Sequence, residues 1–313
     1  MRLIKTKTNI DFLSRKRRNL AVSISILIVV LSIASLATRG LNLGIDFTGG
    51  FLFQVQYPQA ADLVQIRQNL ADAGFGNHVV QEFGTEGEVL VRLPPLPGQE
   101  ANAIRDSVFA ILAGGDPDVN LLLFANVSAQ VGEELTEQGG LAMIFSLLMI
   151  FAYVMFRFQW KFAMGAVAAL AHDVIVTVGF FSVTGISFDL TVVAAVLAVI
   201  GYSLNDTVVA FDRIRENFTK LRGATPEESM NTSINEMLAR TIITGVTTLI
   251  VLTALLVLGG ESVGPFSIAL IVGIIVGTYS SIYTASAAAL MLHVTPQDLL
   301  PPEVDPELID DLP

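Results

Sequence analysis

The sequence predicts a polytopic α-helical membrane protein with six transmembrane helices and a small α/β, ferredoxin-like domain outside the membrane. Hydrophobic residues make up 52% of the 313 and charged residues only 15%, whereas an ordinary soluble domain carries about 25% charge. The apolar residues fall in long runs, which is typical of helices that face lipid rather than of a large soluble core. Residues 39–139 interrupt these runs and are numerous enough for a small domain.

Six stretches are apolar and long enough to qualify as spanning helices, which need about 20 residues each. They are residues 20–38, 140–156, 162–184, 190–211, 241–259 and 265–292. The first is too long for the apolar part of a signal peptide and no clear cleavage site follows it, so we interpret it as a retained anchor. The last is long enough to tilt or to extend past the bilayer. Residues 140–292 therefore form a bundle of five spans that joins the first.

The basic residues predict the orientation of these spans. Lys and Arg gather before the first span, between spans two and three, and between spans four and five, whereas the connections 185–189 and 260–264 carry none. Because basic loops stay in the cytoplasm, we expect both termini to be cytoplasmic. Residues 1–19 are then a basic cytoplasmic N-terminus, 293–313 an acidic cytoplasmic tail, and 39–139 a periplasmic or external domain.

The external domain has a pattern of strands and helices that can be read in order. Alternation predicts a strand over 51–57, and helical spacing predicts a helix over 60–74. A hairpin, a second helix and a last strand follow, over residues 78–83 and 88–93, 98–112, and 121–127. The order β-α-β-β-α-β is ferredoxin-like. This fold hosts unrelated functions, so it does not identify one.

The composition excludes several kinds of functional site. The chain has no cysteine, which excludes disulfides, thiolate metal sites and cysteine nucleophiles. Its three histidines, His78, His172 and His293, are too scattered to predict a zinc site. No GxxxxGK[ST] loop occurs, so a nucleotide-driven motor is not expected. We therefore expect neither an enzyme with a catalytic site nor a metal, a cofactor or a nucleic-acid partner.

Asp206 is the most unusual residue of the fourth span. An ionisable group inside a span is costly and usually faces a partner or a water-filled cavity. Burial disfavours an ionised carboxyl and a nearby cation favours it, so both influences together suit a group that takes up and releases protons. The alternative is a static ion pair that fixes helix packing, and we favour proton handling. Its helical face also carries Tyr202, Ser203, Ala210 and Arg213.

Arg240 is the natural partner of Asp206. It begins the fifth span, and the face behind it carries Thr244, Thr247 and Thr248. If spans four and five pack together, its guanidinium can reach toward Asp206. On position alone, an ordinary anchor at a span end is an equally good interpretation.

His172 and Asp173 place two adjacent ionisable residues near the middle of the third span. Packing alone hardly explains such a pair, although neighbouring positions on a helix point about 100° apart and need not face one site. We group them with Ser203 and Thr247 as a candidate polar network around Asp206.

Small residues recur every four positions along the sixth span, at Gly273, Gly277, Ser281, Ala285 and Ala289. Such a stripe lets two helices approach closely. We therefore interpret it as a packing surface rather than as a binding site.

Six motifs together resemble the SecF family of protein-export membrane proteins. They are GIDFTGG (44–50), VGEEL (131–135), AHDV (171–174), GYSLNDTVVAFDRIREN (201–217), RTIITGVTT (240–248) and GTYSSIYTA (277–285). They cover both ends of the external domain and every span but the first. The tail, 293–313, contains no motif that matches.

The resemblance implies a fold of the resistance-nodulation-division (RND) type, a partner, SecD, and a place in the cell inner (plasma) membrane. It also implies an accessory role at the SecYEG channel, where the family uses the proton motive force to promote translocation of unfolded preproteins after the ATPase SecA has driven them inward. Asp206 then matches the family's proton-linked carboxylate and Arg240 its paired arginine. Two alternatives remain open, a proton-driven small-molecule half-transporter of the RND type and a structural membrane scaffold.

Overall fold

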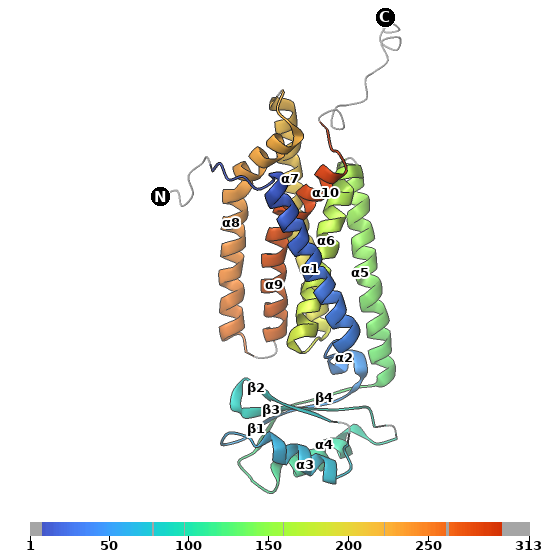
Figure 1. The fold of residues 1–313 in the computed structure, drawn as a ribbon. Coiled ribbons are helices and arrows are strands. Elements are labelled where there is room, and N and C mark those ends of the chain that lie inside the picture. Colours follow the sequence, from blue (N-terminus) through green and yellow to red (C-terminus); the bar gives the residue numbers. More distant parts are fainter. Residues whose placement is uncertain are drawn as a thin grey trace, which may run out of the picture.

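The fold is a bundle of long helices with a small sheet domain at one end (Figure 1). The computed structural model describes residues 8–76, 78–96, 98–158, 160–221, 223–260 and 263–295. The first seven residues of the predicted basic N-terminus and most of the predicted acidic tail, residues 296–313, lie outside the described residues.

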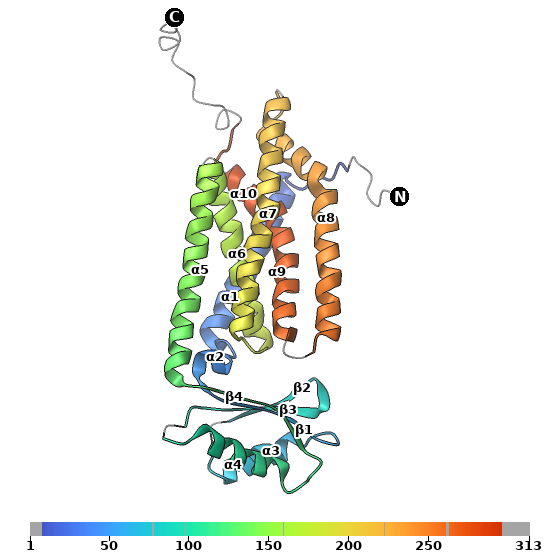
Figure 2. The ribbon, with the colours of Figure 1, turned by 180° about the vertical axis from the view of Figure 1, so that it is seen from behind.

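Six helices of the described chain are long and apolar enough to cross a membrane. They are α1 (Arg15–Arg39), α5 (Ala129–Arg157), α6 (Trp160–Thr184), α7 (Leu190–Lys220), α8 (Pro226–Leu258) and a sixth span divided into α9 (Gly264–Ile282) and α10 (Thr284–Met291). The predicted fold class is confirmed. α1 begins and α10 ends at the end of the bundle that lies opposite the sheet domain (Figures 1 and 2).

The helix α8 begins well before its apolar part, which the sequence places at 241–259. A capping box starts it: the Glu228 N–H donates to Thr225 Oγ1 at 3.2 Å, and the Thr225 N–H donates to the Glu228 carboxylate at 2.9 Å. Pro226 follows at the first helical position, where its missing N–H costs no hydrogen bond. Hydropathy therefore marks only the part of the helix that suits lipid.

Glycines bring α9 close to α7. A Cβ atom at Gly273 would lie 2.1 Å from Val199 Cγ2, and one at Gly277 would lie 3.1 Å from Ser203 Cβ. Larger residues at these positions would push the two helices apart. These contacts show the close packing that the small residues of the sixth span predict.

The sheet domain is a four-stranded antiparallel sheet with two helices on one face. Its elements are β1 (Gly50–Gln56), α3 (Leu63–Asp72), β2 (Val79–Phe83), β3 (Thr85–Leu93), α4 (Ala101–Ala113) and β4 (Asn120–Val127). The strand order β2-β3-β1-β4 is that of the predicted ferredoxin-like fold. The helices α3 and α4 lie on the side of the sheet away from the bundle (Figures 1 and 2). Ile104 of α4 packs in one core with Phe53 and Val91 of the sheet, and all three are fully buried.

A short helix, α2 (Ile45–Thr48), joins α1 to the sheet domain and was not predicted. It lies within the GIDFTGG motif, and Gly49 and Gly50 follow it with φ values of +68° and +116°. Only glycine adopts such conformations without strain. The turn also packs closely on the start of α5, because a Cβ atom at Gly132 would lie 2.8 Å from the Phe47 carbonyl oxygen.

Candidate functional site

Asp206 lies near the middle of α7 and is only 5% exposed. Its Oδ2 atom is buried and has no hydrogen-bond partner among the described residues. A buried carboxyl group without partners is costly unless it can change its protonation state or its surroundings. Asp206 is therefore the side chain of the bundle whose position most needs a functional explanation.

Arg240 acts electrostatically on Asp206 from the neighbouring helix α8. The side chain of Arg240 makes no hydrogen bond or ion pair within the part of the chain that the structure describes. The structure thus brings the two predicted partners near each other without joining them. A cleft of about 290 Å³ between α7 and α8 is lined by Arg240 together with Val209, Asp212, Arg213, Glu216, Glu236 and Met237.

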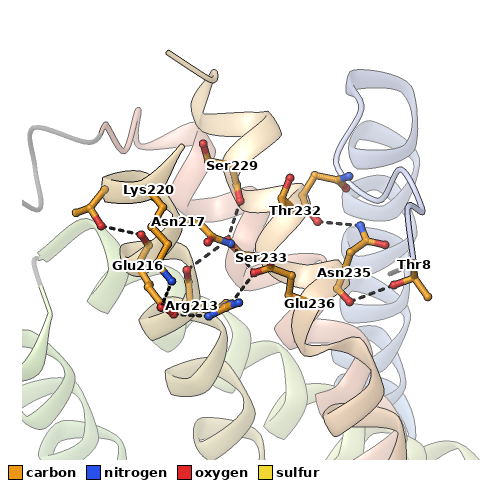
Figure 3. Close-up of polar contacts among 12 residues, drawn as sticks. Thr8, Arg213, Glu216, Asn217, Lys220, Ser229, Thr232, Ser233, Asn235 and Glu236 are labelled. Atoms are coloured by element: carbon orange, nitrogen blue, oxygen red, sulfur yellow. Dashed lines mark hydrogen bonds and ion pairs between the residues drawn. The ribbon is translucent and has the colours of Figure 1, made fainter. Parts of the chain in front are cut away.

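The other charged groups of this cleft are held in ion pairs. Figure 3 shows Arg213 between Glu216 and Glu236, and the Arg213 Nε atom donates to Glu236 at 2.6 Å. Asn217 also donates to Glu236, at 2.8 Å. On the opposite side, Arg157 pairs with Asp212 at 2.7 Å. Arg213 shares a helical face with Asp206, but its charge is neutralised elsewhere. Arg240 is left as the cation near the buried carboxyl.

A second buried carboxyl group, that of Asp173 on α6, is fully hydrogen-bonded. It is 0% exposed, and its Oδ2 atom accepts hydrogen bonds from Ser203 on α7 at 2.6 Å and from Ser280 on α9 at 2.7 Å. The hydroxyl groups of Thr207 and Ser281 form a further contact between α7 and α9 at 3.0 Å. This cluster ties three helices together at the level of the glycine contacts.

Of the remaining members of the predicted network, His172 contacts Asp173, whereas Thr247 bonds only its own helix. His172 Nδ1 lies 3.0 Å from Asp173 Oδ1, and its Nε2 atom is buried without a partner among the described residues. Thr247 donates only to backbone carbonyls of its own helix, those of Ile243 and Thr244. The structure therefore brings His172, Asp173 and Ser203 together and leaves Thr247 apart.

Sequence reasoning missed Ser280 and Thr207 as members of the buried cluster. Both are hydroxyl residues in apolar helices, where such side chains commonly bond their own backbone. The one signal was the run of small polar residues in the GTYSSIYTA motif, next to Gly277. That run indicated close packing but not which carboxyl group the hydroxyls would reach.

Comparison with known proteins places these features in a family. The family model "Protein export membrane protein SecD/SecF, C-terminal" matches residues 108–295, and the model "SecD/SecF GG Motif" matches residues 34–61. The protein translocase subunit SecF of Pseudomonas aeruginosa is 47% identical over 95% of this chain and 96% of its own length. That of Vibrio alginolyticus is 46% identical over 97% and 96% of the two chains.

Two solved structures share the architecture. The crystal structure of SecDF from Thermus thermophilus, a translocon-associated membrane protein, matches with a TM-score of 0.84 and 34% identity over 93% of this chain. A structure of SecDF in a super-membrane-facing form matches with a TM-score of 0.69 and 35% identity over 92% of this chain. This chain spans only 40% and 39% of the length of those two chains.

Six apolar helices around buried polar groups, with a ferredoxin-like domain at one end, define a multi-pass inner-membrane protein with the RND-like architecture of SecDF. The extensive similarity to translocase subunits then narrows the class. The chain belongs to the SecD/SecF family of protein-export membrane proteins, as an accessory subunit of the Sec translocase.

Proposed function

We propose that the chain works with SecD to use the proton motive force for protein export through SecYEG, on unfolded preproteins that SecA has driven into the channel. The observation that carries this proposal is the state of Asp206. It is buried in α7 with an oxygen that lacks a partner, beside an Arg240 side chain that is free of ion pairs among the described residues.

The pair Asp206 and Arg240 suits a switch that a proton operates. An ionised Asp206 attracts the guanidinium of Arg240, and protonation removes that attraction because it removes one of the two charges. The relative position of α7 and α8 then depends on whether the proton is bound. A static ion pair would instead join the two side chains directly, as Arg213 and Glu236 are joined.

The orientation of the chain decides which side of the membrane the Arg240 cleft faces. Basic residues at the start of α1 and at the end of α5 lie at the end of the bundle opposite the sheet domain. The positive-inside rule assigns that end to the cytoplasm, with both termini there and the sheet domain outside. The cleft beside Arg240 then lies toward the cytoplasm, and its charged lining gives a proton released from Asp206 a polar route to the cytoplasm.

The available energy matches a change of conformation of moderate size. One charge that crosses 100 mV releases about 2.3 kcal/mol. This shifts an equilibrium between two conformations by roughly tens-fold. The gradient can therefore bias a movement of the sheet domain, whereas SecA supplies the larger work of insertion.

The test is the substitution Asp206→Asn in chains reconstituted with SecD and SecYEG. We expect normal folding and assembly but loss of the part of preprotein export that depends on the proton gradient. Glu227→Gln is the matched control, because it also neutralises a carboxyl group of the bundle, and Glu227 pairs with Arg18 at 3.1 Å outside the lining of the cleft. Export in Asp206→Asn that still responds fully to the gradient would refute the proposal and favour the scaffold alternative.

A further inference from the structure

The N-terminus of α7 is held by a residue that belongs to the sheet-domain connection. The N–H of Leu190, the first residue of α7, donates to Asp46 Oδ2 at 3.0 Å, across 144 positions of sequence. Asp189, the N-cap residue of α7, accepts from the Val192 N–H of the same first turn at 3.0 Å. Free N–H groups at a helix start need such acceptors. One of the acceptors for α7 therefore comes from the connection between α1 and β1.

The same two segments are joined along their backbones. The Phe188 N–H donates to the Asn42 carbonyl and the Gly44 N–H donates to the Phe188 carbonyl, both at 2.8 Å. The Asn42 side chain donates to the Gly185 carbonyl at 2.8 Å. The rings of Phe47 and Phe188 lie 6.1 Å apart. Residues 42–47 and 185–190 thus form one hydrogen-bonded unit, which we name the α7 clasp.

The sheet domain contacts the α7 clasp through a buried cation. Arg92 on β3 is 8% exposed, and its Nη1 atom donates to the Leu43 carbonyl at 3.0 Å. Its Nη2 atom donates to Gln81 on β2 at 3.2 Å. Burial lowers the pKa of the Arg92 guanidinium from its ordinary value, and the Asp189 carboxylate opposes that effect. Arg92 therefore bonds the sheet to the 42–47 segment of the clasp and interacts electrostatically with Asp189 in the 185–190 segment.

The sheet and the bundle enclose open space beside the clasp. A cavity of about 180 Å³ lies between them, and Asp46, Leu90, Arg92, Asp189 and Pro265 are among its lining residues. The strand β1 follows the short helix α2, whereas β4 leads directly into the spanning helix α5. The clasp is thus one of the joints between the sheet and the bundle, and it is the one that contacts the start of α7.

We infer that Asp46 is a positioning residue that makes the sheet domain follow movements of α7, the helix that carries Asp206. Leu190 and Asp206 lie about 24 Å apart along one continuous helix, at 1.5 Å per residue. A shift or rotation of α7 near Asp206 therefore reaches the clasp, and Asp46 passes it to the GIDFTGG segment and the sheet. This inference rests on the proposed proton coupling and adds the residue that transmits it.

The link can be measured directly because the chain has no native cysteine. Spin labels at Ala110→Cys on α4 and Val257→Cys on α8 report the distance between the sheet domain and the bundle, and both sites are exposed. With Asp46 intact, we expect Asp206→Asn to change the distribution of distances between the two labels. In Asp46→Ala we expect a broader distribution, which Asp206→Asn no longer changes. Asp46→Asn keeps an oxygen acceptor for the Leu190 N–H and should retain the narrow distribution.

The matched control is Asp62→Ala in the sheet domain. Asp62 also accepts N–H groups at a helix start, those of Val64 and Gln65, but it bridges no separate parts of the fold. We expect Asp62→Ala to leave both the distance distribution and export unchanged. A distribution in Asp46→Ala as narrow as that of the wild type would overturn the inference.

Measurements of gradient-dependent export in the Asp46 and Asp206 variants distinguish a failure of this inference from a failure of the proposed function. We expect Asp46→Ala to lose the gradient-dependent part of export to the level of Asp206→Asn, and Asp46→Asn to keep most of it. Full gradient dependence in Asp46→Ala, with a defect in Asp206→Asn, would refute the role of Asp46 alone. Normal export in Asp206→Asn would instead refute proton coupling, and the transmitting role of Asp46 with it.

Discussion

The sheet domain and the membrane bundle both bury apolar side chains, but the bundle also exposes large apolar side chains and buries carboxyl groups. In the sheet domain Phe53 and Val91 are 0% exposed and form the core beneath α3 and α4. In the bundle Phe156 and Leu258 are 96% and 83% exposed on the surface, while Asp173 is fully buried. Water surrounds the first region and lipid the second, so apolar side chains gain by leaving the solvent only in the sheet domain. The two regions are thus stabilised differently, one by apolar burial and the other by close packing and internal hydrogen bonds.

Phe53→Ala should give the largest effect and should break the sheet domain alone. Removing a fully buried phenylalanine costs about 3–5 kcal/mol, a large share of the stability of a small domain. Limited proteolysis in detergent at increasing temperature should show residues 50–127 cleaved while the bundle stays intact. Phe156→Ala on the lipid-facing surface is the control and should leave both regions unchanged. Equal effects of the two substitutions would contradict the comparison.

Asp173→Ala tests the internal hydrogen bonds of the bundle. The substitution removes the carboxylate acceptor of both Ser203 and Ser280 and leaves Ser280 only the Gly277 carbonyl, at a cost of about 1–3 kcal/mol for buried polar groups. Thermal unfolding of the purified protein should show a less stable bundle and an unchanged sheet domain. Asp173→Asn keeps one acceptor oxygen, so the stability of its bundle should lie between that of Asp173→Ala and that of the wild type. An Asp173→Ala bundle as stable as the wild type would show that these contacts add nothing.

The smallest expected effect concerns Tyr57, which should make the stability of the sheet domain fall at high pH. Its hydroxyl donates to the Leu112 carbonyl at 2.9 Å, and burial raises the pKa of Tyr57 to about 12 from 10.0. Because the folded pKa is the higher one, the stabilisation is complete below pH 10 and is lost as the pH rises toward 12. After a discount for partial exposure we expect a loss of about 1 kcal/mol. Unfolding of the sheet domain followed between pH 9 and 12 should show it, and Tyr57→Phe should remove this dependence.

The features that sequence could predict are those that leave a local pattern. Apolar runs predicted the six spans, and the alternation around Phe53 predicted the first strand. Asp206 could be found because a charge inside an apolar run is conspicuous by itself. Its unpaired state could not be predicted, since that depends on where α8 places Arg240 relative to α7.

Other features depend on contacts between distant segments. Ser280 and Thr247 look alike in sequence, as hydroxyl residues in apolar helices, yet one reaches Asp173 and the other bonds its own backbone. Only the crossing of α6, α7 and α9 distinguishes them. Asp46 was visible within a motif, but its acceptor role requires a helix that begins 144 positions later.

The register of the sheet has a consequence for how this chain can be built and modified. Gly50, at the entry to the sheet domain, pairs with Val127 at its exit, on the neighbouring strands β1 and β4. Paired residues of antiparallel strands lie about 5 Å apart between their Cα atoms. The whole domain is therefore a cassette whose two ends meet, so it can be removed or exchanged for another with a short linker.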